Sequence, residues 1–365
     1  MDSPLLSHLS KVLSLSPPQS SYSASTLTGP LTSHTGTAYL FLSISSAFPR
    51  LQVHSYPAIH WARAYISNIP APDGPISSLE ECLGLSSDVL SGTAVRACIT
   101  QDLSHVRTFL NLLTPILASI NSRDTAPLPS CLVHGLAGTL YLLRLIRHWV
   151  ASSAPLVSRA IVHISEYLLS VPWSCPRSSS HGAADGELGT LTQLVLTSPP
   201  LAPRLAEKLT ELLELQGPDG DWPSPAAPAQ PGSRSECLTF ATGATGLVVS
   251  LASLRPFFPS LQDRLDAVVA DARDFIARHQ RELLGETSLW YGTLGTSLAF
   301  PKGLQRTNSM NLPSPSPTSE STSTGESSTE SSSPGAVAKA HDPGAAWVLA
   351  VCEREMPRML FYNDV

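Results

Sequence analysis

Gly243-Ala-Thr-Gly246-Leu-Val-Val-Ser-Leu is one of four stretches in which two glycines, three residues apart, open an apolar run. The other three are Gly135-Leu-Ala-Gly138-Thr-Leu-Tyr-Leu-Leu, Gly186-Glu-Leu-Gly189-Thr-Leu-Thr-Gln-Leu and Gly292-Thr-Leu-Gly295-Thr-Ser-Leu-Ala-Phe. They recur at intervals of about 50 residues, a period typical of stacked supersecondary units. Weaker forms of the pattern begin at Gly36, Gly92 and Gly344, so the sequence predicts about seven repeated units.

The segments between the glycine stretches are amphipathic. Within 156–168 and 261–276, apolar residues recur at three- and four-residue spacing, the period of an α-helix with one buried face. Alternating β-branched residues are nearly absent, so no sheet is expected. Glycines at the start of the apolar helices let backbones pack closely and leave amide groups free. The predicted fold is all-α, an α/α toroid of six to seven helical hairpins with an inner ring of apolar helices and an outer ring of amphipathic ones.

Composition excludes several classes of protein. Only 14% of the 365 residues are charged, the formal net charge is −6, and the basic residues form no block, so no nucleic-acid partner is expected. No apolar stretch reaches the roughly 18 residues of a membrane-spanning helix, and residues 1–18 lack the pattern of a secretory signal. We therefore expect a cytoplasmic protein that does not span a membrane. Its six cysteines are far apart in the sequence, which is typical of reduced, buried thiols.

Local composition predicts four regions. Residues 1–30 are expected to be a loosely ordered, Ser-rich lead, and residues 31–303 the helical toroid. Residues 304–343 are rich in Ser, Thr and Pro and nearly without large apolar side chains, which predicts a disordered insertion. Residues 344–365 are predicted to form a C-terminal helix that completes the ring. A Pro/Ser stretch at 223–235 is expected to be a surface loop.

Two stretches of the sequence resemble a known protein family. Residues 237–254 read CLTFATGATGLVVSLASL, and residues 288–300 read SLWYGTLGTSLAF. They resemble the last repeats of lanthionine synthetase C-like (LanC-like) proteins of the fungal type, which contain a Trp/Phe-Cys-His-Gly-Ala-Pro-Gly box and a Leu-Cys-His-Gly-x-x-Gly box. Upstream, Gly182-Ala-Ala-Asp-Gly-Glu-Leu-Gly189 is similar to the family's Gly-Ala-Ala-His-Gly-x-x-Gly, and Asp221-Trp222-Pro223 to its Asn-Trp/Tyr-Pro turn. The resemblance covers most of the chain outside the Ser/Thr-rich insertion and implies seven α/α hairpins.

The resemblance also implies a zinc centre whose ligands this chain lacks. Family enzymes hold zinc through a cysteine of the first box and a Cys-His pair of the second, and the metal lowers the pKa of a substrate thiol that adds to a dehydroamino acid. The corresponding residues here are Ala241, followed by Thr242 in place of histidine, and Trp290 and Tyr291. Alanine and tryptophan cannot ligate zinc, so no metal and no cofactor are expected. Cys237, four residues before Ala241, has no partner ligands nearby in the sequence.

Asp185 stands where the family carries a histidine that serves proton transfer. A carboxyl group is a poorer proton donor at neutral pH than imidazolium, so this role is not simply inherited. An acid/base pair of Asp185 and Glu187 is one alternative. However, a two-residue offset on a helix points side chains apart, and carboxylates at a helix start commonly complement its dipole.

The remaining candidates each have a structural alternative. The rings of Trp290 and Tyr291 either stack on a ligand or fill the vacated cavity, and filling is favoured. His134 and His181 precede glycine stretches and are expected to be structural, with His181 the better candidate for binding. The stretch QGPDGDW at 216–222 also resembles a terpene-cyclase repeat, but it occurs once and a turn explains it. The candidate ligand-binding residues are His181, Asp185, Thr242, Trp290 and Tyr291, and Asp185 is the catalytic candidate.

Two functions remain open from the sequence. The first is a LanC-like protein that has lost its zinc centre, impaired or non-catalytic, and binds a peptide, a glutathione-like thiol or a protein partner in the mouth of the toroid. The second is an active enzyme on the same scaffold, performing glutathione addition to dehydroamino acids or metal-independent carbohydrate chemistry through Asp185, Glu187 or Tyr291. Fold resemblance decides neither, because function depends on the site.

Overall fold

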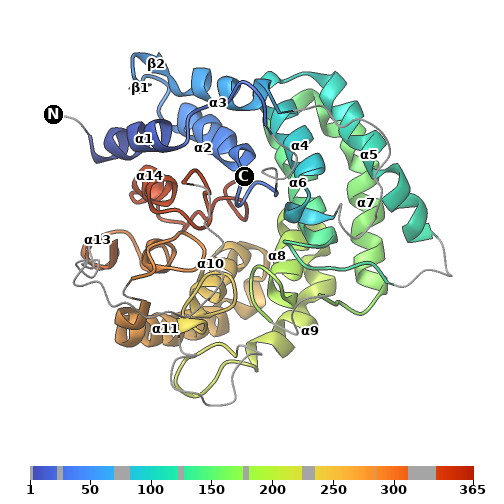
Figure 1. The fold of residues 1–365 in the computed structure, drawn as a ribbon. Helices are drawn as coiled ribbons and strands as arrows, with labels where there is room; N and C mark the ends of the chain where they lie inside the picture. The colour runs from blue at the N-terminus through green and yellow to red at the C-terminus, as the bar shows by residue number, and fades with distance from the viewer. Residues whose placement is uncertain are drawn as a thin grey trace, which may run out of the picture.

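The structure is a computed structural model that describes residues 3–22, 28–69, 83–121, 127–175, 181–223, 235–283, 285–310 and 334–365. Within these ranges the chain forms fourteen α-helices and one two-stranded ribbon, in which β1 (Gln52–Val53) pairs antiparallel with β2 (Tyr56–Pro57). The protein is therefore mostly helical, as the repeat pattern predicted (Figure 1). None of the described helices is long and apolar enough to cross a membrane.

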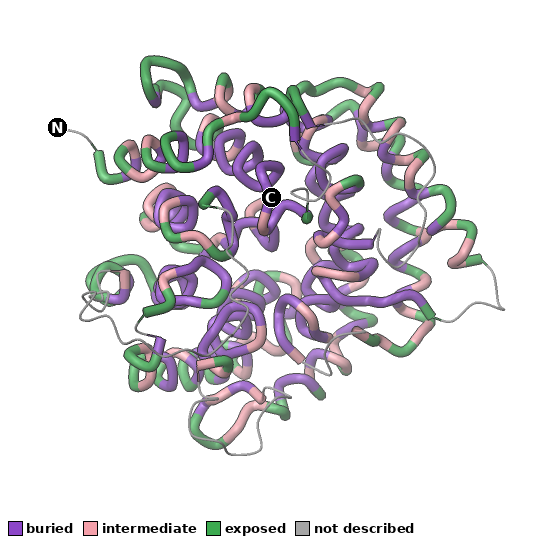
Figure 2. The backbone as a smooth tube through the Cα atoms, in the orientation of Figure 1, coloured by how far each residue is buried: buried purple, intermediate pink, exposed green. Residues whose placement is uncertain are grey.

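Two kinds of helix alternate along the chain. One kind is buried on most sides and comprises α2 (His34–Ala47), α4 (Asp88–Thr100), α6 (Leu136–Trp149), α8 (Glu187–Thr197), α10 (Ala244–Leu254), the short α12 (Thr293–Ser297) and α14 (His341–Val351). The other kind buries mainly one face and comprises α1 (Pro4–Leu15), α3 (Ala58–Ser67), α5 (Leu103–Asn121), α7 (Ala154–Ser170), α9 (Ala202–Leu213), α11 (Gln262–His279) and α13 (Leu304–Met310) (Figure 2). The predicted alternation of apolar and amphipathic helices is confirmed.

Neighbouring helices pack in a regular order. Helix α4 packs on α2 and α6, α8 packs on α6 and α10, and α14 packs on α12 and α2. Each one-faced helix packs against the buried helix that precedes it in the chain, as α3 does on α2 and α11 on α10. Helix α1 is the exception, because it packs against α14, so the N-terminal helix covers the last buried helix (Figure 1).

Tight turns precede the buried helices, and backbone hydrogen bonds join each turn to the next. The amide-to-carbonyl pairs are Ser86 to Val133 (2.7 Å), Leu132 to Ala184 (3.1 Å), Ala184 to Ala241 (3.0 Å), Ala241 to Trp290 (3.2 Å), Trp290 to Ala338 (3.1 Å) and Ala338 to Leu31 (3.0 Å). Gly29, whose φ is +88°, lies against the backbone of Leu85 and Ser86 and so connects the first turn with the second. Turns far apart in the sequence are thus held in one connected series.

The second glycine of each stretch is required by a close approach of the chain to itself. A Cβ atom on Gly138 would lie 2.0 Å from the carbonyl oxygen of Leu132, and one on Gly246 would lie 2.1 Å from that of Phe240. The same contact, with the carbonyl six residues earlier, recurs at Gly36, Gly189 and Gly295. The first turn of each helix therefore rests directly on the turn before it, which explains why the glycines repeat.

The C-terminal segment lies among the buried helices, and its end is near the middle of the view in Figure 1. The guanidinium of Arg144 on α6 donates a hydrogen bond of 2.6 Å to the carbonyl of Tyr362, which also accepts one from Gln193 on α8 at 3.2 Å. The Asn363 amide donates to the hydroxyl of Ser253 on α10 at 2.7 Å. The last residues thus tie together three helices that are distant in sequence.

Three predicted boundaries need correction. Residues 4–15 of the lead are helix α1, because Leu5, Leu9, Val12 and Leu13 form a buried stripe. Of the predicted insertion 304–343, residues 304–310 are helix α13, the Ala336–Ala338 turn is buried, and 311–333 lie outside the described residues. The C-terminal helix ends at Val351, and 352–365 form turns whose side chains bond to other helices. Most of the 223–235 loop, 224–234, also lies outside the described residues.

Candidate functional site

Most of the predicted site residues lie on four neighbouring turns, at 131–135, 182–186, 238–243 and 288–292, which we call the turn face. Each turn ends at the first glycine of a stretch, and Gly135, Gly186, Gly243 and Gly292 are the N-caps of α6, α8, α10 and α12. Because the glycines hold the turns at fixed positions, side chains between them are set at equivalent places in each unit.

Asp185 lies between groups from two other turns. Its carboxylate is within 4.8 Å of the sulfur atoms of Cys131 and Cys175, and the two sulfurs are also within 4.8 Å of each other. On another side, its negative charge acts on Tyr291, whose pKa is raised to about 12, first by burial and then by Asp185. Tyr291 nevertheless keeps 38% of its surface exposed. Asp185 therefore lies close to the two cysteines, and its charge also acts on Tyr291 from another turn.

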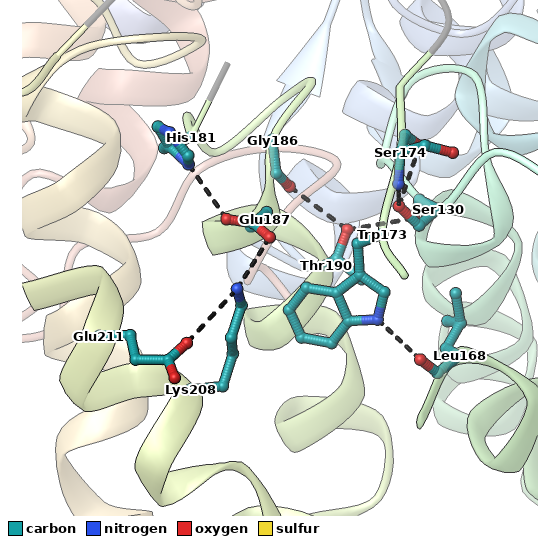
Figure 3. A network of polar contacts seen from close by, with 10 residues as sticks. All are labelled: Ser130, Leu168, Trp173, Ser174, His181, Gly186, Glu187, Thr190, Lys208 and Glu211. Carbon is teal, nitrogen blue, oxygen red and sulfur yellow. Dashed lines mark hydrogen bonds and ion pairs between the residues drawn. The ribbon is translucent and has the colours of Figure 1, made fainter. Parts of the chain in front are cut away.

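The two cysteines are held by the backbone on either side of them. The amide of Ser130 donates to the carbonyl of Ser174 at 2.9 Å, and the amide of Ser174 donates to the Ser130 hydroxyl at 2.9 Å (Figure 3). Cys131 and Cys175 follow these serines directly. The pKa of the Cys131 thiol is raised, because it hydrogen-bonds with Cys175, because it is buried, and because Asp185 is nearby. Cys131 is 1% exposed, whereas Cys175 and Asp185 are half-buried.

Glu187 belongs to a separate polar network on the first turn of α8. Its carboxylate pairs with Nδ1 of His181 at 3.0 Å and with Nζ of Lys208 at 2.9 Å, and Lys208 also lies 3.7 Å from Glu211 (Figure 3). The Lys208 ammonium stands 5.9 Å from the ring centre of Trp173, within cation–π range. Asp185 and Glu187 thus face different neighbours, as their two-residue offset predicted.

The positions that the resemblance assigns to the family's zinc ligands hold no metal-binding set. Ala241 is 2% exposed, and Trp290 is fully buried, its indole nitrogen donating to the carbonyl of Leu360 at 3.3 Å. The Trp290 ring packs edge-on against Phe240, with ring centres 5.1 Å apart, so it fills interior space. Thr242 donates its hydroxyl to the carbonyl of Glu236 at 2.8 Å. Tyr291 alone offers a donor atom, and one phenol does not make a zinc site, so these residues do not fit the metal.

The stretch at 216–222, also singled out from the sequence, is structural. Gln216 donates to the carbonyls of Gly220 and Val268, at 3.3 and 3.0 Å, and Gly220 has a φ of +85°. Trp222 is fully buried, so the stretch at 216–222 is a turn with a core anchor, as expected. The backbone of His134 hydrogen-bonds with Cys131, and the His134 side chain is half-buried.

Sequence reasoning missed the cysteine pair. Cys131 and Cys175 come from different units, and no spacing rule for metal or redox motifs links residues this far apart. One signal was present, because both follow a serine, in Pro129-Ser130-Cys131 and Trp173-Ser174-Cys175, and it is the serines that pair. The expectation of isolated, buried thiols holds for Cys98, which is 0% exposed, and fails for this pair.

Comparison with models of known protein families finds no match, and no curated protein sequence matches the chain.

Proposed function

We propose that this chain is a LanC-like α/α toroid of seven hairpins without the family's zinc centre, and that it binds a glutathione-like thiol at the turn face. The observation that carries the binding proposal is the grouping of Cys131 and Cys175 with Asp185, within 4.8 Å of one another, on a face that also holds the partly exposed Tyr291. Titratable groups from separate elements that perturb one another are more frequent at binding sites than elsewhere.

The order of helix contacts supports the toroid. Seven buried helices, each paired with a one-faced helix, follow one another through contacts that run from α2 to α10 and return from α12 through α14 to α2. The turns carry a matching series of hydrogen bonds, in which Ala338 donates to Leu31. Six α/α hairpins within the chain, and a seventh made of α14 and α1, are the simplest arrangement that satisfies these contacts.

The charges on and beside the turn face suit a small zwitterionic thiol peptide. Lys208, on α9, and His181, next to the turn at 182–186, are basic groups for a ligand carboxylate; 36% of each side chain is exposed, and both also contact Glu187. Asp185 provides an anionic group for a ligand ammonium, and the Tyr291 hydroxyl provides a neutral donor. Glutathione carries two carboxylates, one ammonium and one thiol, so it presents a matching group to each of these residues.

The enzyme alternative receives less support from the described residues. Carbohydrate hydrolysis needs two carboxylates that flank one bond, yet Glu187 is held by Lys208 and His181 while Asp185 faces the cysteines. Thiol addition of the family type needs the zinc that Ala241 and Trp290 cannot hold. We therefore assign binding, rather than turnover, to the turn face.

Isothermal titration of the whole chain with glutathione tests the proposal. We expect saturable one-to-one binding that weakens in Tyr291→Phe by about 3- to 10-fold, the loss of one hydrogen bond. Tyr56→Phe is the matched control, because Tyr56 is also exposed, at 50%, but lies on β2 away from the turn face. Absence of binding, or equal weakening by both variants, would contradict the proposal. Addition of glutathione to a dehydroalanine peptide by the purified chain would instead establish the enzyme alternative.

A further inference from the structure

We propose that Cys131, Cys175 and Asp185 form a binding site for a thiolate-seeking divalent metal ion, zinc foremost, at a place distinct from the family's zinc position. The proposal does not depend on the proposed function, because it concerns a metal held by three protein side chains whether or not a thiol ligand binds beside it. If it holds, the expectation from the sequence of a chain without metal is wrong.

The donor set matches zinc. The three side chains offer two sulfur atoms and one carboxylate oxygen, and all three atoms lie within 4.8 Å of one another. Around a tetrahedral zinc with bonds of about 2.0–2.3 Å, neighbouring ligand atoms are roughly 3.3–3.8 Å apart, so small side-chain adjustments suffice. Two thiolates also favour zinc over magnesium or calcium, which prefer oxygen ligands.

Backbone contacts hold the three ligands in place before any metal binds. The paired backbone of Ser130 and Ser174 sets Cys131 beside Cys175. The amide of Leu132, next to Cys131, donates to the carbonyl of Ala184, next to Asp185, at 3.1 Å. Each of the three ligands therefore lies next to a residue that is hydrogen-bonded to the segment of another ligand. This arrangement lowers the conformational entropy that is lost when the metal binds.

The site is buried on one side and accessible on the other, where the ion and its fourth ligand can exchange with solvent. Cys131 is 1% exposed and forms the floor, whereas Cys175 and Asp185 are half-buried. Three protein ligands leave the fourth position of a tetrahedral ion for water or another small ligand, as in catalytic rather than structural zinc sites.

Two alternatives to this site fit the described residues less well. A disulfide between Cys131 and Cys175 would use the two sulfurs but gives no role to the carboxylate within 4.8 Å of them. A second cluster of possible ligands, at His8, His341 and Asp342, is already neutralised, since Asp342 pairs with His8 at 2.7 Å and lies 3.8 Å from Lys11. A cation there would have to displace these partners.

Metal analysis of the full chain tests the site. Protein purified under reducing conditions is loaded with Zn²⁺ or Co²⁺, freed of unbound ion, and assayed by elemental analysis and absorption spectroscopy. We expect one ion per chain and, with Co²⁺, a sulfur-to-metal charge-transfer band. Asp185→Asn and Cys175→Ser, at half-buried positions that tolerate near-isosteric exchange, should each weaken zinc binding at least about 10-fold, and Cys175→Ser should also reduce the band. Cys237→Ser is the matched control and should bind as the parent does.

Three results would overturn the site. They are absence of bound ion in the reduced parent, retention of the ion by a folded Cys131→Ser/Cys175→Ser double variant, and a Cys131–Cys175 disulfide that persists in reductant. Circular dichroism establishes which variants are folded. If a cysteine variant does not fold, Asp185→Asn still tests the site. Glutathione titration of the metal-free chain is a separate measurement, so failure of either proposal leaves the other one testable.

Discussion

Tyr39 donates a hydrogen bond of 2.6 Å to the carboxylate of Asp364, which lies 325 residues further along the chain. Tyr141 donates to the same carboxylate at 3.0 Å. Both tyrosines are fully buried, so Asp364 is anchored to the interior of the protein. Nearby, burial lowers the pKa of Arg144 to about 10, which leaves this guanidinium charged at neutral pH beside the tail. The C-terminal segment is thus part of the core.

Asp364→Asn is expected to destabilise the protein by about 1–3 kcal/mol at neutral pH, because it weakens two hydrogen bonds to a charged acceptor. Urea denaturation of parent and variant measures the change. A variant as stable as the parent would show that the tail is not an anchor. Gln216→Ala, which removes hydrogen bonds in a surface turn, serves as a control for loss of a side-chain contact far from the tail.

The difference in stability between the parent and Asp364→Asn should depend on pH. Burial raises the pKa of Asp364 above its unfolded value of 3.8, although the two tyrosine hydroxyls lower it. Between these two pKa values the folded state binds more protons than the unfolded state, so the contribution of Asp364 to stability falls as pH rises and is constant above the folded pKa. The stability advantage of the parent over Asp364→Asn should therefore shrink from about pH 4 upward and then level off. An advantage that grows with pH would contradict the raised pKa.

Gly138→Ala should lower stability by about 1–3 kcal/mol or more, because its Cβ would lie 2.0 Å from the Leu132 carbonyl oxygen and 2.7 Å from the Gly84 Cα. Gly92→Ala is the matched control in α4. There the nearest atom to an added Cβ is 3.5 Å away, so the exchange should be neutral or stabilising by up to about 1 kcal/mol. Thermal unfolding of the two variants compares them, and equal effects would show that the close approach is absent in solution.

The sequence predicted those parts of the fold in which the same local contact recurs from unit to unit. The contact that excludes a side chain at Gly138 also does so at Gly246 and Gly295, so the requirement appears as a period in the sequence. Helix α1 was missed because its apolar residues alternate in sequence with serines on the exposed face, and because its partner, α14, lies at the other end of the chain. Cys131 and Cys175 were missed for a similar reason, since only tertiary contacts bring their units together.

The candidate site was predicted in part. Asp185 and Tyr291 lie on the turn face, because the glycine stretches fix the register of each turn. A space-filling role for Trp290 was favoured from the sequence. Its hydrogen-bond partner, Leu360, and the engagement of Glu187 by Lys208 on helix α9 depend on tertiary contacts that no local pattern identifies.

The Ser/Thr/Pro-rich segment should be dispensable only in its middle. Deletion of 311–333 is expected to leave the melting temperature within about 2 °C, because Leu312 is the one large apolar side chain in this stretch. Deletion of 304–343 should lower it by many degrees, since it removes Arg306, which is 1% exposed and hydrogen-bonded to the carbonyls of Phe300 and Cys352, and the Ala338 turn. Similar melting temperatures for the two deletions would show that α13 and this turn do not contribute to the core.

Restoring the family's ligands tests the proposed correspondence of the two boxes. The variant carries Ala241→Cys, Trp290→Cys and Tyr291→His in a Cys131→Ser/Cys175→Ser background, so that zinc at the other candidate site does not interfere. The backbone hydrogen bond of 3.2 Å from Ala241 to Trp290 places these positions on adjacent turns, and we expect the triple exchange to create one zinc site.

Replacing the fully buried Trp290 should cost about 3–5 kcal/mol, and bound metal should recover part of it, so the melting temperature is expected to rise on addition of zinc. Elemental analysis counts the ion. Trp290→Cys alone in the same background is the control; it carries the same cavity but lacks two of the three ligands, so zinc should not stabilise it. Thiol addition need not return, because the proposed correspondence places Asp185 where the family carries its proton-transferring histidine. A folded variant that binds no zinc would mean that these three side chains do not converge, and the correspondence with the LanC-like boxes would have to be abandoned.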